Sequence, residues 1–96
     1  MIRHIVMWRV SDTAFAREQV KQGFEGLRGR IPGLRRLEVG IDISAADDAC
    51  DVVLVSDFES QAALDAYATH PEHLRVRREL GTLRTSRHLV DYVVQE

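Results

Sequence analysis

The chain has 96 residues, which is the length of one small domain. Hydrophobic residues make up 45% of it and charged residues 29%, a composition typical of folded globular proteins that excludes intrinsic disorder. The 13 basic and 15 acidic residues leave a formal net charge of −2, so no basic surplus favours nucleic acid. We expect a single domain over residues 1–96, without a nucleic-acid partner.

The same sequence predicts a cytoplasmic protein with no membrane partner. No apolar run approaches the roughly 20 residues that a membrane span requires. The first ten residues, MIRHIVMWRV, do not have the pattern of a signal peptide. Cys50 is the single cysteine, so an intramolecular disulfide is not available to the sequence given, which fits a reducing compartment.

The chain opens with the patterns of a strand and a helix. Residues 2–10 alternate with a period of two, which predicts a strand. One face of this strand carries Ile2, His4, Val6, Trp8 and Val10. Ser11 and Asp12 are suited to cap a following helix. An apolar stripe then predicts an amphipathic helix over about 13–29, formed by Ala16, Val20, Phe24 and Leu27.

Two further strands are predicted in the middle of the chain. Pro32 and Gly33 end the first helix by restricting the backbone and supplying a turn. The alternation over residues 37–43 then predicts a strand with one wet face. A polar loop over 44–50 leads to a third strand at 52–58, with Val52, Leu54 and Phe58 opposite Val53 and Val55.

The last third predicts two consecutive helices and a final strand. Ser60 caps a helix over about 61–69. Pro71 suits the first position of a second helix over about 71–80. Residues 87–94 form the last strand, with Leu89, Asp91 and Val93 on one face and His88, Val90, Tyr92 and Val94 on the other.

The order βαββαβ predicts an α+β, ferredoxin-like fold. Both helical layers cover one face of a four-stranded antiparallel sheet, with the last strand beside the first and the third on its other side. Three strands carry apolar residues on both faces, as Ile5 and Met7 show in the first strand. Because the helices cover only one face, we expect a second copy of the chain to cover the other, giving a homodimer. The alternative is a half-wet sheet with scattered surface aliphatics.

A phenol and several imidazoles gather around the break between the last two helices. Tyr67, His70 and His73 lie within seven residues there. If the His4 face meets the helices, His4 lies beneath this segment, and Asp91 of the neighbouring strand can orient an imidazole. These groups suggest a pocket for acid–base chemistry. The alternative is that each is structural: a core histidine, a core tyrosine and a histidine that caps a helix.

Other chemistries have weaker support. His4, His70 and His73 offer three nitrogens for a metal, but the Pro71 break disrupts the helical face that they would need, and we predict no metal. Cys50 stands among aspartates, which disfavour a reactive thiolate. The basic stretch is interpreted as a solvated face, with attraction of an anionic substrate to the pocket mouth as the alternative. It comprises Arg75, Arg77, Arg78, Arg84 and Arg87.

Four segments together resemble the stress-response dimeric A/B barrel family, called Dabb. They are MIRHIVMWRV, IPGLRRLEVGIDIS, DVVLVSDFES with LDAYATHPEHLRV, and the ending DYVV. The resemblance implies a homodimeric α+β barrel. The family includes plant olivetolic acid cyclase, and by that likeness Tyr67 and His73 match its catalytic pair, His4 and His70 its pocket histidines, and Asp91 its final-strand aspartate. Arg77 and Arg84 depart from its pattern, where the cyclase has a small residue and a tryptophan.

Two functions follow as hypotheses. The first is a stress-response barrel protein that binds a small hydrophobic or polyketide-like molecule between sheet and helices. The alternative is a cofactor-independent cyclase or lyase of the olivetolic acid cyclase type, with His73 as general base and Tyr67 as enolate stabiliser. In both, His4, His70 and Asp91 line the pocket with an apolar wall of Val6, Trp8 and Phe24. A monooxygenase rests on analogy with other dimeric barrels alone.

Overall fold

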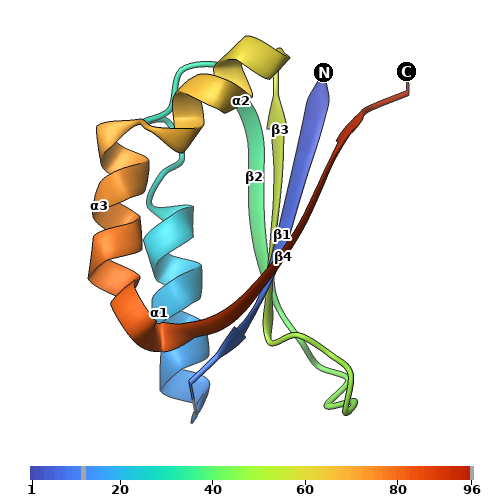
Figure 1. Cartoon of the computed structure of the whole chain (residues 1–96), viewed down its shortest axis with the longest axis vertical. Helices are drawn as coiled ribbons and strands as arrows, with labels where there is room; N and C mark the ends of the chain where they lie inside the picture. The colour runs from blue at the N-terminus through green and yellow to red at the C-terminus, as the bar shows by residue number, and fades with distance from the viewer. Residues whose placement is uncertain (12, 96) are drawn as a thin grey trace.

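The computed structural model describes residues 1–11 and 13–95, and the predicted cap Asp12 lies outside them. One four-stranded antiparallel sheet has the order β2-β3-β1-β4, which confirms the predicted neighbours of the first strand. The elements are β1 (Ile2–Val10), α1 (Thr13–Glu25), β2 (Leu34–Ile41), β3 (Val52–Phe58), α2 (Gln61–Ala68), α3 (Pro71–Leu80), a 3-10 turn η1 (Gly81–Leu83) and β4 (Arg84–Val93). Figure 1 shows the helices gathered on one face of this sheet.

The core lies between the helices and the sheet face that carries Val6 and Trp8. The predicted stripe of α1 is fully buried there, and so are the alternate residues of β3. The largest buried side chains include Phe24, Phe58, Leu27 and Leu54. The period-two and period-3.6 patterns therefore identified the buried faces of β1, α1 and β3 correctly.

Three elements have boundaries that differ from the prediction by more than one residue. Helix α1 ends at Glu25, and residues 26–30 form turns, because glycine at Gly26 and Gly29 weakens a helix. Strand β2 begins earlier and ends at Ile41, so Ile43 is 99% exposed in the following loop. Strand β4 begins three residues before the predicted strand, at Arg84.

The ends of α2 and α3 follow from local side-chain chemistry. Ser60 caps α2 as predicted, because its hydroxyl accepts from the backbone N–H of Ala63 at 3.1 Å. Pro71 stands at the start of α3, where its missing N–H costs nothing. None of the helices within the described residues is long and apolar enough to cross a membrane.

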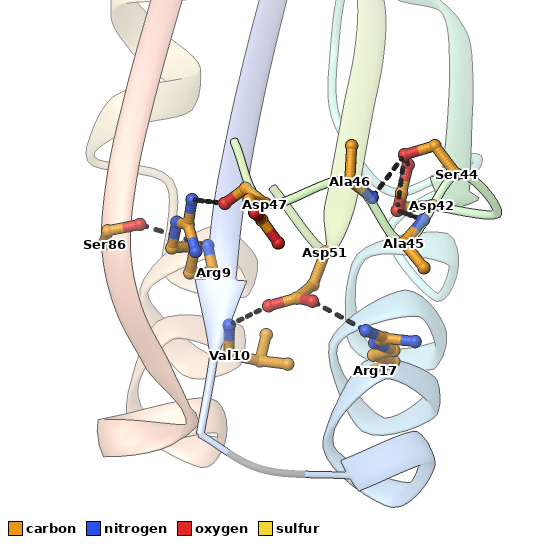
Figure 2. Close-up of polar contacts among 10 residues, drawn as sticks. All are labelled: Arg9, Val10, Arg17, Asp42, Ser44, Ala45, Ala46, Asp47, Asp51 and Ser86. Atoms are coloured by element: carbon orange, nitrogen blue, oxygen red, sulfur yellow. Dashed lines mark hydrogen bonds and ion pairs between the residues drawn. The ribbon is translucent and has the colours of Figure 1, made fainter. Parts of the chain in front are cut away.

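The loop between β2 and β3 is fastened to the end of β1 and to α1 (Figure 2). Asp51 accepts from the backbone N–H of Val10 and from the guanidinium of Arg17, each at 2.8 Å. Both bonds lower the pKa of Asp51, the bond from Val10 first. Arg9 donates to the Asp47 carbonyl at 3.2 Å. These contacts hold the end of β1 next to α1, beneath the site described below.

The second face of the sheet is uncovered by the described helices (Figure 1). It carries exposed apolar side chains, among them Met7 at 38%, Val90 at 50% and Tyr92 at 43% exposure. One part-buried ion pair also lies there: Arg3 donates two hydrogen bonds to Asp57, at 2.7 and 2.9 Å. The predicted apolar excess on three neighbouring strands is therefore present on β3, β1 and β4.

Candidate functional site

A cavity of about 590 Å³ lies between the sheet and the helices. That volume is in the usual range for small-molecule sites. Side chains from β1, β3, β4 and all three helices line it. Its apolar wall consists of Val6, Trp8, Phe24, Leu54, Leu64 and Leu89.

His73 of α3 is held in one tautomer at this cavity. Its Nδ1 lies 3.2 Å from the carbonyl oxygen of Ala68, and because a carbonyl only accepts, Nδ1 carries the hydrogen. The lone pair of the neutral ring is then on Nε2. Burial lowers the pKa of His73, and the hydrogen bond to the Ala68 carbonyl partly opposes this by raising it. The charges of Arg77, His4 and Arg84 lower the pKa further. His73 is therefore a neutral base near pH 7.

Tyr67 of α2 stacks against the His73 ring, with centroids 4.1 Å apart. It is buried and lines the same cavity. Burial raises the pKa of the Tyr67 phenol well above its ordinary value of 10, because the phenolate would lose its solvation. The hydroxyl therefore stays protonated near neutral pH and remains a hydrogen-bond donor.

His4 and Asp91 meet across the β1–β4 ladder, where they are register partners. The His4 Nδ1 and an Asp91 carboxylate oxygen are 2.5 Å apart. The carboxylate fixes the ring orientation and places the hydrogen on Nδ1. The His4 ring also packs edge-on against Tyr67, at 6.2 Å between centroids. The predicted approach of Asp91 to an imidazole on the helix side of the sheet is confirmed.

His70 is the predicted pocket residue that the structure places elsewhere. Its Nδ1 accepts from the backbone N–H of Glu72 at 3.1 Å, so the ring caps α3. Within the described part of the chain, His70 is not among the residues that line the cavity. The expectation that it faces the pocket is wrong, because proline at position 71 starts a new helix whose free N–H groups need an acceptor. No group of metal-ligating side chains is found among the described residues.

Seven polar residues line the cavity in addition to those predicted: Gln61, Asp65, Arg77, Arg84, Thr85, Ser86 and Arg87. Arg84 is half-buried, so the solvated-face interpretation is wrong for it, whereas Arg77 and Arg87 are exposed as that interpretation expects, although they also line the cavity. The positions of two of these arginines, Arg77 and Arg87, could have been predicted from the sequence. Arg77 stands four residues after His73 on one helix face, and Arg87 shares the strand face of Leu89 and Asp91.

The position of Arg84 at the cavity could not be predicted from the sequence pattern, because it depends on a β-bulge in β4. Val10 pairs with Arg84 whereas Arg9 pairs with Ser86, so Thr85 is the extra residue. Regular alternation from Arg87 would have placed Thr85 on the cavity side. The bulge brings Arg84 to the inner face as well, so that both Thr85 and Arg84 line the cavity, and the Arg84 guanidinium lies 5.7 Å from the centroid of the Trp8 ring.

A neutral imidazole and a protonated phenol that line the same cavity are the two groups needed to transfer a proton. His73 offers a lone pair on Nε2, and Tyr67 offers an O–H donor. The two rings are in contact, so one bound molecule can reach both. Such a set suits removal of a proton from carbon next to a carbonyl, with the charge received by the oxygen.

The fold and the cavity together define a ferredoxin-like α+β domain with a ligand-sized internal site. The chain belongs to the Dabb family, the stress responsive A/B barrel domain, whose model matches residues 2–94. Among curated protein sequences, none shows significant similarity to it.

Solved structures of similar fold agree with this membership. A dimeric ferredoxin-like protein of unknown function from Bacteroides fragilis is 29% identical, with a TM-score of 0.82 over 95% of this chain and 93% of its own. One from Thermobifida fusca is 28% identical, with a TM-score of 0.84 over 97% and 90%. A hydroxynitrile lyase from Passiflora edulis is 20% identical, with a TM-score of 0.82 over 99% and 94%, a likeness of fold alone.

Proposed function

We propose that the chain binds a small carbonyl compound in the cavity and transfers a proton at the carbon next to the carbonyl. His73 takes this proton on Nε2 as the C–H bond breaks. The electron pair moves to the carbonyl oxygen, which accepts a hydrogen bond from Tyr67. Return of the proton from the His73 imidazolium to the carbon completes an exchange or, on the opposite face, a change of configuration. Alternatively, the enolate carbon attacks a second carbonyl and forms a C–C bond, and the alkoxide so formed takes the proton from the imidazolium, which completes an aldol-type cyclisation.

The observation that carries this proposal is the fixed tautomer of His73. A base must present its lone pair to the substrate, and the bond from Nδ1 to the Ala68 carbonyl leaves Nε2 for that purpose. The lowered pKa of His73 keeps the ring neutral, and the raised pKa of Tyr67 keeps the donor protonated. His4, oriented by Asp91, is assigned to bind the substrate next to the phenol.

Deuterium exchange tests this proposal without knowledge of the natural substrate. The protein is incubated in D₂O with 2-heptanone or 6-oxoheptanoate, and NMR follows loss of the protons next to the ketone. We expect protein-dependent exchange with at least one ketone. His73→Ala should lower its rate by about 10²–10⁴-fold, and Tyr67→Phe by about 10²–10³-fold.

The control is Arg78→Ala, an exposed position on the same helix that lies outside the described cavity lining. It should exchange as the unsubstituted protein does. Binding without exchange would contradict catalysis and favour a protein that only binds its ligand. Full exchange by His73→Ala would remove His73 from the mechanism.

We also propose that the protein is a homodimer, paired through the uncovered sheet face. The apolar side chains of β1, β3 and β4 on that face support the proposal, as do the dimeric relatives of 28–29% identity. Sedimentation at micromolar concentration should give twice the chain mass of 10.9 kDa. A monomer under those conditions would contradict it.

A further inference from the structure

Three arginines at the cavity have no anionic partner. Arg77 of α3 and Arg84 and Arg87 of β4 line it, and the guanidinium group of none of them has an ion pair or hydrogen bond to a residue that the structure describes. Several arginines elsewhere are paired, among them Arg3 with Asp57 and Arg75 with two glutamates. Neighbouring guanidinium groups that are not paired with a carboxylate repel one another, and a bound anion relieves this repulsion.

Arg84 is the most constrained of the three. Its Nε is buried and without a hydrogen-bond partner among the described residues. Its guanidinium lies over Trp8 and Phe24, 5.7 and 5.8 Å from the ring centroids. Burial lowers the pKa of Arg84, and the charges of Arg77 and Arg87 act in the same direction. A buried donor in this position needs an acceptor.

The charges of the residues that line the cavity indicate the net charge of the anion that would balance them. Arg77, Arg84 and Arg87 face two carboxylates, Asp65 and Asp91. Asp91 already accepts from His4, and Asp65 accepts from Gln61 at 3.0 Å. Counted over these three guanidinium groups and two carboxylates, one positive charge is in surplus. A monoanion balances it, whereas a phosphate dianion would leave a negative excess.

We propose that Arg84, with Arg77 and Arg87, binds the carboxylate of a small organic acid whose apolar body lies along the aromatic wall. The planar guanidinium matches a carboxylate with two parallel hydrogen bonds. The inference rests on the proposed function for the reacting end: the substrate carries its ketone at His73 and Tyr67, and its carboxylate at the arginines. The substrate class is therefore a keto acid, held at both ends.

Trp8 makes this proposal testable by direct titration. It is the only tryptophan, it is 2% exposed and it lines the cavity, so its emission reports on the site. The probes are octanoate and octanamide, which match in size and differ in charge. We expect octanoate to bind about tenfold or more tightly, since a hydrogen bond to a charged group is worth that much. Added salt should weaken the binding of octanoate and leave the binding of octanamide unchanged.

Substitutions identify the residues responsible. Arg84→Gln and Arg77→Gln should each raise the Kd of octanoate about tenfold and leave that of octanamide unchanged, which also shows that the pocket is intact. Arg78→Gln, one position along α3 and outside the described lining, is the matched control and should bind octanoate normally. Equal affinity of the two probes, or no response to either, would overturn the proposal.

The two proposals fail separately. Octanoate has no ketone, so its binding does not need His73, and His73→Gln should still bind it. Charge-dependent binding together with absence of deuterium exchange would retain the acid site and refute the catalysis. Deuterium exchange with 2-heptanone, together with equal affinity for octanoate and octanamide, would retain the catalysis and refute the acid site.

Discussion

Gly33→Ala tests how the turn before β2 supports the helix that carries Tyr67. Gly33 has φ of +80°, and a Cβ there would lie 2.6 Å from the Cβ of Ala63 in α2. The left-handed backbone costs a non-glycine residue about 1–2 kcal/mol, and forcing an extra methyl into a packed contact costs about 1–3 kcal/mol. We expect the free energy of unfolding to fall by about 2–5 kcal/mol.

Gly29→Ala is the matched control, because it shares the backbone cost and lacks the clash. Its φ is +75°, and nothing lies within 4 Å of the added Cβ. It should lose only about 1–2 kcal/mol, and the reduced freedom of the unfolded chain is the same in both variants. Urea denaturation of both at one protein concentration gives the comparison. Equal losses would refute the argument that close approach of α2 to this turn positions the helix.

Three further results are expected. Arg3→Ala leaves the Asp57 carboxylate, whose residue is 3% exposed, without its guanidinium partner, and should lower the free energy of unfolding measured in urea; an unchanged free energy would contradict this. Because burial and then Arg77 lower the pKa of His73, exchange activity should persist below pH 6.5, and its acid limb should move to higher pH in Arg77→Gln; an unmoved limb would contradict that charge effect. Val90→Asp, on the uncovered sheet face, should convert the dimer to monomer in sedimentation, and an unchanged dimer would place the interface elsewhere.

The sequence predicted the architecture because its patterns are long and regular. Alternation in β1 and β3 identified which side chains are buried, and the stripe of α1 did the same for the helix. Strand order followed from the ferredoxin-like element order, and the register then placed His4 beside Asp91. The ends of the elements were predicted less well, because they depend on one or two residues. Helix α1 ends at Glu25 because glycines follow it, and strand β2 ends at Ile41, where the loop begins.

The site was predicted only in part, for reasons that lie in local geometry. Single-residue patterns do not show that His70 uses its ring nitrogen as a helix cap, or that a bulge at Thr85 places Arg84 inside. The tautomer of His73 depends on the carbonyl of Ala68, which appears only once α2 and α3 are placed. A cytoplasmic location and a role in stress stay predictions.

The measurement that tests the account most directly is the protonation of the His73 ring, read from long-range ¹H–¹⁵N NMR spectra and assigned by comparison with His73→Gln. We expect the neutral ring to carry its hydrogen on Nδ1, with Nε2 bare, and to have a pKa below the ordinary value of about 6.5. A hydrogen on Nε2, or a pKa at or above that value, would contradict a base that presents its lone pair to the cavity.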